Sequence, residues 1–173
     1  LGGDDAVRLP IPLMNVINGG AHADNAVDVQ EFMLAPVGFD DFPTALRAGV
    51  EVYHVLKKRL KSRHLVTAVG DEGGFAPDFV SDELVLDELV AAIEQAGYTV
   101  GHDQQFNFAL DVAASELFRD GSYHLGSHPE PLSSEQLIDH WSLLCERFPF
   151  TSIEDGLDEE DWDGWKQMTS RLS

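Results

Sequence analysis

A chain of 173 residues with 43% hydrophobic residues and three tryptophans is long enough to bury a core, which excludes an intrinsically disordered protein. The 31 acidic and 11 basic residues give a formal charge of -20, so we expect neither nucleic acid nor an anionic membrane among its partners. We expect a cytoplasmic protein because there is no apolar run of ~20 residues, no signal-peptide pattern and a single cysteine, Cys145.

The first part of the chain is predicted to contain a linker and two strands. Residues 1–9 are rich in glycine and aspartate and form the linker, after which residues 10–173 form the folded unit. Strands are predicted in LPIPLMNVIN and VDVQEFMLAP. The loop between them, GGAHADNA, contains Gly19 and Gly20, which permit unusual backbone angles.

A helix is predicted over residues 43–61, because apolar residues recur at spacings of three and four while lysines occupy the opposite face. Its expected buried residues are Leu46, Val50, Tyr53, Leu56 and Leu60. HLVTAVG is predicted to be the next strand. Ser81 then caps a second helix, which ends at Gly97. Its expected buried stripe is Val85, Leu86, Leu89, Val90 and Ile93.

The second half of the chain continues with further strands and helices. FNFALD and FTSIED are predicted strands, and Asp120-Gly121 is a predicted turn between two short strands. Ser133 and Gln136 have the pattern of a capping box ahead of a helix. In the last helix, Trp162, Trp165 and Met168 are expected to share one face. Helices that alternate with apolar strands from residue 43 onward predict an α/β protein with a parallel sheet.

Four acidic residues lie inside an apolar strand or at the end of one: Glu31, Glu72, Asp111 and Glu154. In a parallel barrel the carboxyl ends of all strands open on one face, so Asp111 and Glu154 are expected to converge. Convergent carboxylates need a compensating cation, and their oxygens suit Mg²⁺. The alternative for each acid alone is a structural role as a helix cap or an ion-pair partner. We expect such capping for Asp155 and Asp158, ahead of the last helix.

His22 lies in the glycine-flanked loop between the first two strands, where an imidazole can close over an anionic substrate. The alternative is an ordinary surface histidine. Two other metal patterns are rejected. Residues 159–170 lack the twelfth-position glutamate of a calcium loop, and His124 and His128 flank Gly126 in a turn rather than sharing a helix face.

Five segments, taken together and in this order, resemble the enolase family: LMNVINGGAHADN, VQEFMLAPVG, TAVGDEGGFAPD, ALDVAASELF and SIEDGLDEEDWDGW. The resemblance runs from about Leu9 to the last residue. It implies a partial TIM-type, enolase-like barrel, with residues 10–173 forming the N-terminal half of the family's C-terminal barrel domain. It also implies a lyase, a phosphopyruvate hydratase that uses Mg²⁺ to dehydrate 2-phosphoglycerate to phosphoenolpyruvate in glycolysis.

The resemblance assigns roles to five residues. It implies that Asp111 and Glu154 are two of three carboxylate ligands of Mg²⁺. It implies that Glu31 and Glu72 form the acidic pair that protonates the departing hydroxyl group. It implies further that His22, Glu31 and Glu154 contact the substrate.

Other parts of the family's machinery have no counterpart in the chain. These are the N-terminal domain, the third metal ligand, the lysine that removes the α-proton and the residues that grip the substrate phosphate. We therefore expect the segment alone to be inactive, and a non-catalytic, enolase-like binding or structural protein is the alternative function. By the same resemblance the parent protein is expected to be a homodimer or a larger homo-oligomer, with the cell surface or secretion as further locations.

Overall fold

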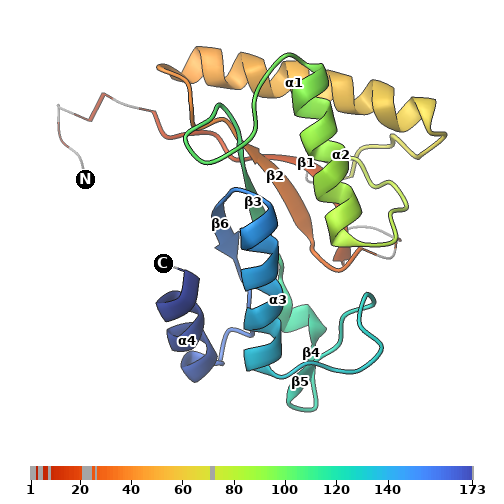
Figure 1. The fold of residues 1–173 in the computed structure, drawn as a ribbon, viewed down its shortest axis with the longest axis vertical. Coiled ribbons are helices and arrows are strands. Elements are labelled where there is room, and N and C mark those ends of the chain that lie inside the picture. Colours follow the sequence, from red (N-terminus) through yellow and green to blue (C-terminus); the bar gives the residue numbers. More distant parts are fainter. Residues whose placement is uncertain are drawn as a thin grey trace.

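The structure is a computed structural model that describes residues 3, 6, 7, 9–20, 25, 27–70 and 73–172. A four-stranded sheet has the order β1-β2-β3-β6, and β4 and β5 form a separate hairpin (Figure 1). The strands are β1 (Met14–Asn18), β2 (Glu31–Ala35), β3 (Asn107–Asp111), β4 (Phe118–Arg119), β5 (Ser122–Tyr123) and β6 (Phe150–Glu154). The helices are α1 (Phe42–Ser62), α2 (Asp82–Gln95), the 3-10 helix η3 (Ala114–Leu117), α3 (Ser134–Arg147) and α4 (Trp162–Leu172).

The helices begin at capping residues that the sequence carries. The side chain of Asp41 accepts the backbone N–H of Thr44 at 2.8 Å, which fixes the first turn of α1. Ser81 caps α2, and Ser133 and Gln136 form both hydrogen bonds of the capping box at the start of α3. The predicted beginnings of α2 and α3 are therefore confirmed.

Two predicted helix faces are wrong in part. In α1, Leu46 and Val50 are 39% and 41% exposed, and the buried face lies one residue away. That face consists of Ala45, Ala48, Gly49, Val52, Leu56 and Leu60. Its small residues let the helix approach β1 closely, since a side-chain carbon on Gly49 would collide with the sulfur of Met14. In α4, Trp162 is exposed at the first position of the helix, whereas Met168 is buried.

The sheet is mixed: the parallel pairing predicted from residue 43 onward is found between β3 and β6, whereas the earlier strand β2 is antiparallel to its neighbours. β2 runs antiparallel to β1 and to β3, and only β3 and β6 form a parallel pair. The prediction of a strand at residues 64–70 is also wrong, because only Val69 joins a bridge there, to Phe75. Phe75 takes the place beside β1: its N–H donates to the carbonyl of Val16 at 2.9 Å, and its carbonyl accepts the N–H of Asn18 at 2.8 Å.

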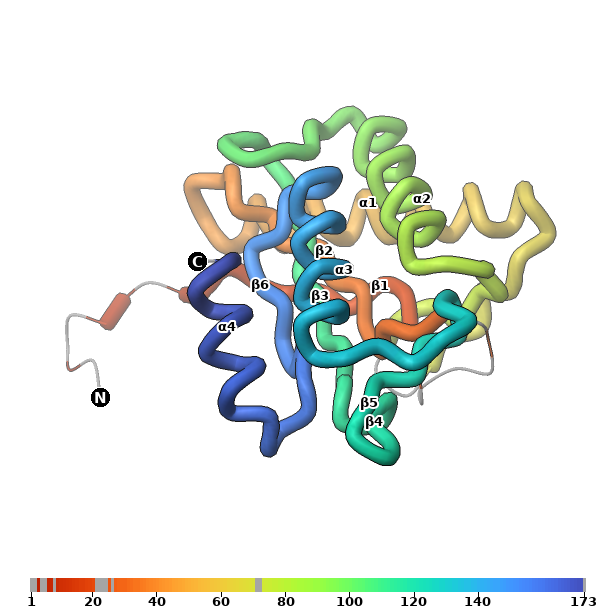
Figure 2. The backbone as a smooth tube through the Cα atoms, turned by 60° about the horizontal axis from the view of Figure 1, so that its bottom comes forward, coloured from red at the N-terminus to blue at the C-terminus, as the bar shows by residue number. Residues whose placement is uncertain are grey.

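The hydrophobic core lies against one face of the central strands, because Phe32 is opposite Leu110 and Leu34 is opposite Phe108 in the β2–β3 pair. Phe32 and Leu34 in β2 and Phe108 and Leu110 in β3 are fully buried. Figure 1 shows α1 and α2 at one end of the molecule and α3 and α4 at the other, and Figure 2 shows α3 and α4 side by side next to β6. None of the helices in the described part of the chain has the length and hydrophobicity needed to cross a membrane.

Candidate functional site

Three of the four predicted acids are neighbours across the sheet. Glu31 is the register partner of Asp111 in the β2–β3 pair, and Asp111 is the register partner of Glu154 in the β3–β6 pair. Asn18 of β1 is opposite Glu31 on the other side. These four residues, which we call the polar row, therefore cross all four strands in sequence. Neighbouring strands are about 5 Å apart, so adjacent side chains of the row can contact one small molecule.

The antiparallel direction of β2 explains how Glu31 joins this row. Asn18, Asp111 and Glu154 are the last residues of their strands, whereas Glu31 is the first residue of β2. Because β2 runs in the opposite direction, its beginning lies at the edge where the other three strands end. The row thus depends on the mixed topology that the sequence did not predict.

The backbone turns sharply just after the two acids of the parallel pair. Ala113 and Asp155 both have left-handed backbone angles, with φ of 51° and 48°, which cost roughly 1–2 kcal/mol at a non-glycine residue. The N–H of Ala113 donates to Oδ1 of Asp111 at 3.1 Å, and the N–H of Ala114 donates to the carbonyl of Asp155 at 2.9 Å. The second of these bonds ties the ends of β3 and β6 together. Strain of this kind often occurs at functional sites.

The electrostatics of the row favour a cation. Partial burial raises the pKa of Glu154, and the negative charges of Asp111 and Asp155 raise it further. Glu154 forms no ion pair with any residue in the described part of the chain. A positive charge placed between Asp111 and Glu154 would relieve this repulsion.

The donor set fits part of a magnesium site. Asp111 and Glu154 offer hard oxygen ligands from adjacent strands, and Mg²⁺ is commonly held by a few carboxylates together with waters and substrate oxygens. Among the described residues no group of three or more His, Cys, Asp or Glu side chains is arranged to hold a metal ion.

The remaining two predicted site residues, His22 and Glu72, lie outside the described residues. Gly19 and Gly74, which lie three and two positions away from them along the chain, are described. Before His22, the N–H of Gly19 donates to the carbonyl of Gln30 at 3.0 Å, next to Glu31. After Glu72, the carbonyl of Gly74 accepts the side-chain N–H of Asn18 at 2.9 Å. Both flanks are thus attached at the end of the sheet that carries the polar row.

Asn18 is a member of the row that the sequence did not single out. It is fully buried, and its side-chain oxygen accepts a hydrogen bond from Asn15 at 2.6 Å while its amide group donates to Gly74. The available signal was an amide at the end of an apolar strand. The prediction that Asp155 and Asp158 cap the last helix is wrong. The cap of α4 is Asp161, whose side chain accepts the N–H of Gly164 at 2.9 Å.

Residues 6–173 match the family model described as "Enolase, C-terminal TIM barrel domain". The chain belongs to the enolase family. The curated protein "Enolase" of Legionella pneumophila (strain Lens) is 56% identical over 168 residues, which cover 97% of the chain and 39% of that protein. The "Enolase" of Sulfurimonas denitrificans is 55% identical over 172 residues, covering 99% of the chain and 40% of that protein.

Membership of the enolase family confirms the resemblance and the TIM-type barrel fold class. The open sheet of the described residues is consistent with a partial barrel. The chain spans about two fifths of the length of these curated enolases.

Proposed function

We propose that the natural polypeptide containing this chain is a phosphopyruvate hydratase, which dehydrates 2-phosphoglycerate to phosphoenolpyruvate in glycolysis with Mg²⁺. The observation that carries the proposal is the adjacency of Glu31, Asp111 and Glu154 on neighbouring strands. It is supported by the name "Enolase" of relatives that are 55–56% identical over almost the whole chain.

In this proposal Asp111 and Glu154 hold the metal through their carboxylate oxygens. The bound ion would supply neutralisation of the negative charge that develops on the substrate carboxylate once the α-proton is lost. The position of Glu154 beside Asp111 supports this assignment, and so does its raised pKa, to which the negative charges of Asp111 and Asp155 contribute after desolvation. Glu154 would also contact the substrate.

Glu31 and Glu72 are proposed to act as the acidic pair. When the substrate loses its α-proton, the bond from the β-carbon to the hydroxyl oxygen breaks, and a proton from this pair converts the departing hydroxide into water. The position of Glu31 one strand away from Asp111 supports its share of the role. Glu72 and the substrate contact of His22 rest on the family resemblance.

Several wider features belong to the same proposal. The protein would act in the cytoplasm as a homodimer or a larger homo-oligomer, with residues 10–173 as the first half of its barrel and residues 1–9 as a linker. The cell surface and secretion are further proposed locations that rest on the resemblance alone.

A second candidate function is a non-catalytic, enolase-like binding or structural role. It is favoured by the placement of the four lysines of the chain, Lys57, Lys58, Lys61 and Lys166, which all lie on α1 or α4 rather than at the polar row. None of these four lysines lies where it could remove an α-proton at the polar row, as a catalytic role would require.

The test is turnover of 2-phosphoglycerate by the purified natural polypeptide, followed through the ultraviolet absorbance of phosphoenolpyruvate. We expect turnover with Mg²⁺, loss of turnover after chelation and recovery when Mg²⁺ is restored. Circular dichroism before and after chelation controls for unfolding. Absence of turnover in the folded protein with Mg²⁺ would reject the catalytic proposal and favour the non-catalytic function.

A further inference from the structure

Two acids outside the polar row, Asp28 and Asp82, are among the most buried charged side chains that the structure describes. Asp28 is 7% exposed and Asp82 is 2% exposed. Asp28 lies three residues before Glu31, in the segment 27–30 that leads into β2, and Asp82 is the first residue of α2. Burial of a carboxylate is unfavourable without compensating hydrogen bonds, so the contacts of both residues need an explanation.

Asp28 is held by a distant loop. Its Oδ1 accepts the N–H of Gly126, and its Oδ2 accepts the N–H of Ser127 at 3.0 Å and the hydroxyl of Ser127 at 2.7 Å. Three donors thus satisfy one carboxylate. The bonds join parts of the chain that are almost 100 positions apart, and they fix the side chain of Asp28 from one side.

Asp82 holds the backbone of the same segment from another side. Its Oδ1 accepts the N–H of Asp28 at 3.2 Å and the N–H of Val29 at 3.4 Å. Its Oδ2 is buried and has no hydrogen-bond partner in the described part of the chain. Burial raises the pKa of Asp82 to about 7, and the charge of Asp28 adds to the effect.

The two acids hold the segment 27–30 from two sides. We use the name clasp for Asp28 and Asp82 together with their partners Gly126 and Ser127. Val29, between the two ends of the segment, is fully buried and anchors it in the core. Only Val29 and Gln30 separate Asp28 from Glu31, so a shift of the clasp would be transmitted to Glu31. On the far side, Glu31 is held by its pairing in the sheet.

We propose that Asp28 and Asp82 are positioning residues that hold Glu31 in the polar row for the loss of hydroxide, an inference that rests on the proposed function. In that step the carbon–oxygen bond of the substrate breaks and a proton passes to the leaving oxygen. A general acid must lie within hydrogen-bond reach of its target, and a misplacement of about 1 Å can cost roughly 100-fold in rate. The clasp therefore acts on the reaction through Glu31, without contact with the substrate.

The experiment separates the two chemical steps in the natural polypeptide. Exchange of the substrate α-proton with solvent deuterium reports proton removal, and formation of phosphoenolpyruvate reports the complete reaction. The main variant is Asp28→Asn, which replaces one accepting oxygen by an amide group facing the donors of the loop. Ser127→Ala is a milder variant that removes one donor and leaves the two backbone donors, so the test remains decisive where Asp28→Asn fails to fold.

The matched control is Glu88→Gln, which changes another buried acid, 4% exposed, in the interface between α1 and α2. We expect Asp28→Asn to slow product formation by about tenfold, Ser127→Ala by about threefold, and neither to change α-proton exchange by more than about twofold. Glu88→Gln should lower stability without separating the two rates.

The positioning role of the clasp would be overturned if Asp28→Asn and Ser127→Ala reduced α-proton exchange and product formation equally. It would also be overturned if neither variant reduced either rate. The proposed function would stand in both cases. A wild-type protein that forms no product under the same conditions would reject the proposed function, and the inference with it. Wild-type turnover with a selective loss of product formation supports both.

Discussion

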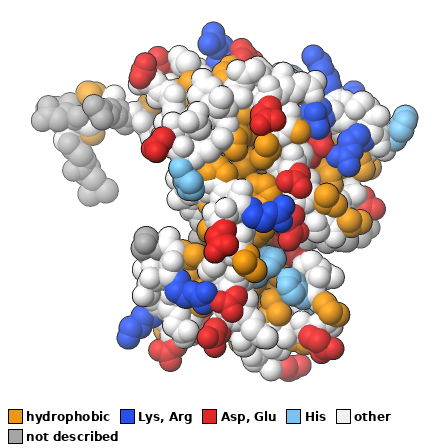
Figure 3. Space-filling model, viewed as in Figure 1, with side chains coloured by type: hydrophobic (Ala, Val, Ile, Leu, Met, Phe, Trp, Pro, Cys, Tyr) orange, Lys and Arg blue, Asp and Glu red, His pale blue; other side chains and the backbone are white. Residues whose placement is uncertain are grey.

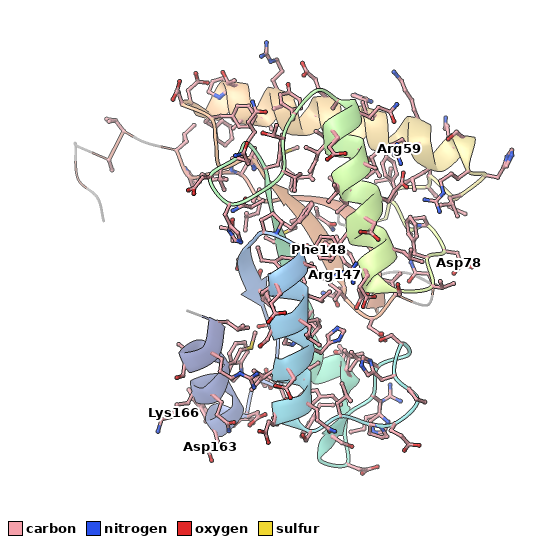
Figure 4. All side chains as sticks on the ribbon, in the orientation of Figure 1. Arg59, Asp78, Arg147, Phe148, Asp163 and Lys166 are labelled. Atoms are coloured by element: carbon pink, nitrogen blue, oxygen red, sulfur yellow. The ribbon has the colours of Figure 1, made fainter. Side chains whose placement is uncertain are left out.

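Glu88 in α2 and Glu154 at the end of β6 show how differently two regions of this molecule use the same side chain. Glu88 is buried, and its carboxylate accepts hydrogen bonds from Nε of Arg59 at 2.7 Å and from Nη1 of Arg63 at 2.6 Å. Figure 4 shows Arg59 between α1 and α2, where it also donates to Gln95. Glu154 is instead exposed and lies beside Asp111 and Asp155, and partial desolvation together with these two negative charges raises its pKa.

The distribution of cations explains the difference. Five of the 11 basic residues lie between positions 57 and 63, and Figure 3 shows basic side chains gathered toward the α1 end of the visible face. Glu88 is close to them and is neutralised within the fold. The polar row has like charges on adjacent strands, which is the arrangement expected of the proposed cation site. Charge paired internally stabilises a fold, whereas charge left crowded marks a binding site.

The largest expected effect comes from removing a charge of the row. Asp111→Asn should lower turnover by at least about 100-fold and weaken Mg²⁺ binding, because one carboxylate of the proposed metal site is lost. Its free energy of unfolding should stay the same or rise, since repulsion with Glu154 is reduced. Steady-state kinetics, Mg²⁺ titration and urea unfolding measure the three quantities.

The matched control for this prediction is Asp139→Asn, an exposed acid of α3 that pairs with Arg171 at 2.6 Å. It should leave turnover and Mg²⁺ affinity unchanged. Full activity of Asp111→Asn would remove Asp111 from the proposed metal site.

The opposite pattern is expected for Glu88→Gln. Loss of the negative charge leaves Arg59 and Arg63 facing each other without a counter-ion, so the free energy of unfolding should fall by about 3 kcal/mol. Turnover at a temperature where the variant is folded should not change. Urea unfolding monitored by tryptophan fluorescence gives the first quantity. A large loss of turnover with unchanged stability would contradict the structural role of Glu88.

The sequence predicted the local elements better than their arrangement. Capping residues and apolar periodicity located α2 and α3, because these signals act within a few residues. The direction of β2 was missed, because a strand carries no local signal for the orientation of its neighbours. The convergence of Asp111 and Glu154 followed from a rule for parallel strands, and it holds because β3 and β6 are the parallel pair.

The remaining misses are long-range contacts. The buried face of α1 is displaced because alanine and glycine permit close packing, and hydrophobicity alone favoured the larger Leu46 and Val50. Asp28 was visible only as an acid inside the predicted strand VDVQEFMLAP. Its partners are almost 100 positions away, a separation that periodicity cannot bridge.

Asp82 provides an intermediate case between the two regions, since it is buried like Glu88 but forms no ion pair with any basic residue that the structure describes. Its pKa of about 7 lies above the ordinary value of 3.8, so the folded protein binds more protons than the unfolded chain between these values. The stability from the neutral form is complete below about pH 4 and is lost as the pH rises to about 7. The contribution of Asp82 to the free energy of unfolding should therefore fall by on the order of 3 kcal/mol across this range.

The variant Asp82→Asn tests that dependence, since it keeps one oxygen for the N–H groups of Asp28 and Val29 and carries no charge. Urea unfolding at several pH values should give a flatter profile for the variant, with the largest gain over wild type above pH 7. An identical pH profile in the two proteins would show that Asp82 titrates normally in the folded state. Glu83 and Asp28, the nearest acids that act on it, remain in both proteins.

The smallest effect is expected for an exposed pair at the junction of α2 and α3. Nη2 of Arg147 is 4.0 Å from Oδ1 of Asp87, and both side chains are about half exposed, so solvent screens their attraction. Arg147 also lies over the ring of Phe148, and Figure 4 shows these two residues together; a single Arg147→Ala change would therefore mix two contacts. A double-mutant cycle with Asp87→Ala isolates the ion pair, and we expect a coupling free energy below about 0.5 kcal/mol.

The corresponding cycle for Arg63 and Glu88 should give a coupling free energy above about 1 kcal/mol, because Glu88 is buried and the distance between the two groups is short. Similar couplings in the two cycles would show that burial does not distinguish these acids, and the contrast between Glu88 and Glu154 would then need another cause.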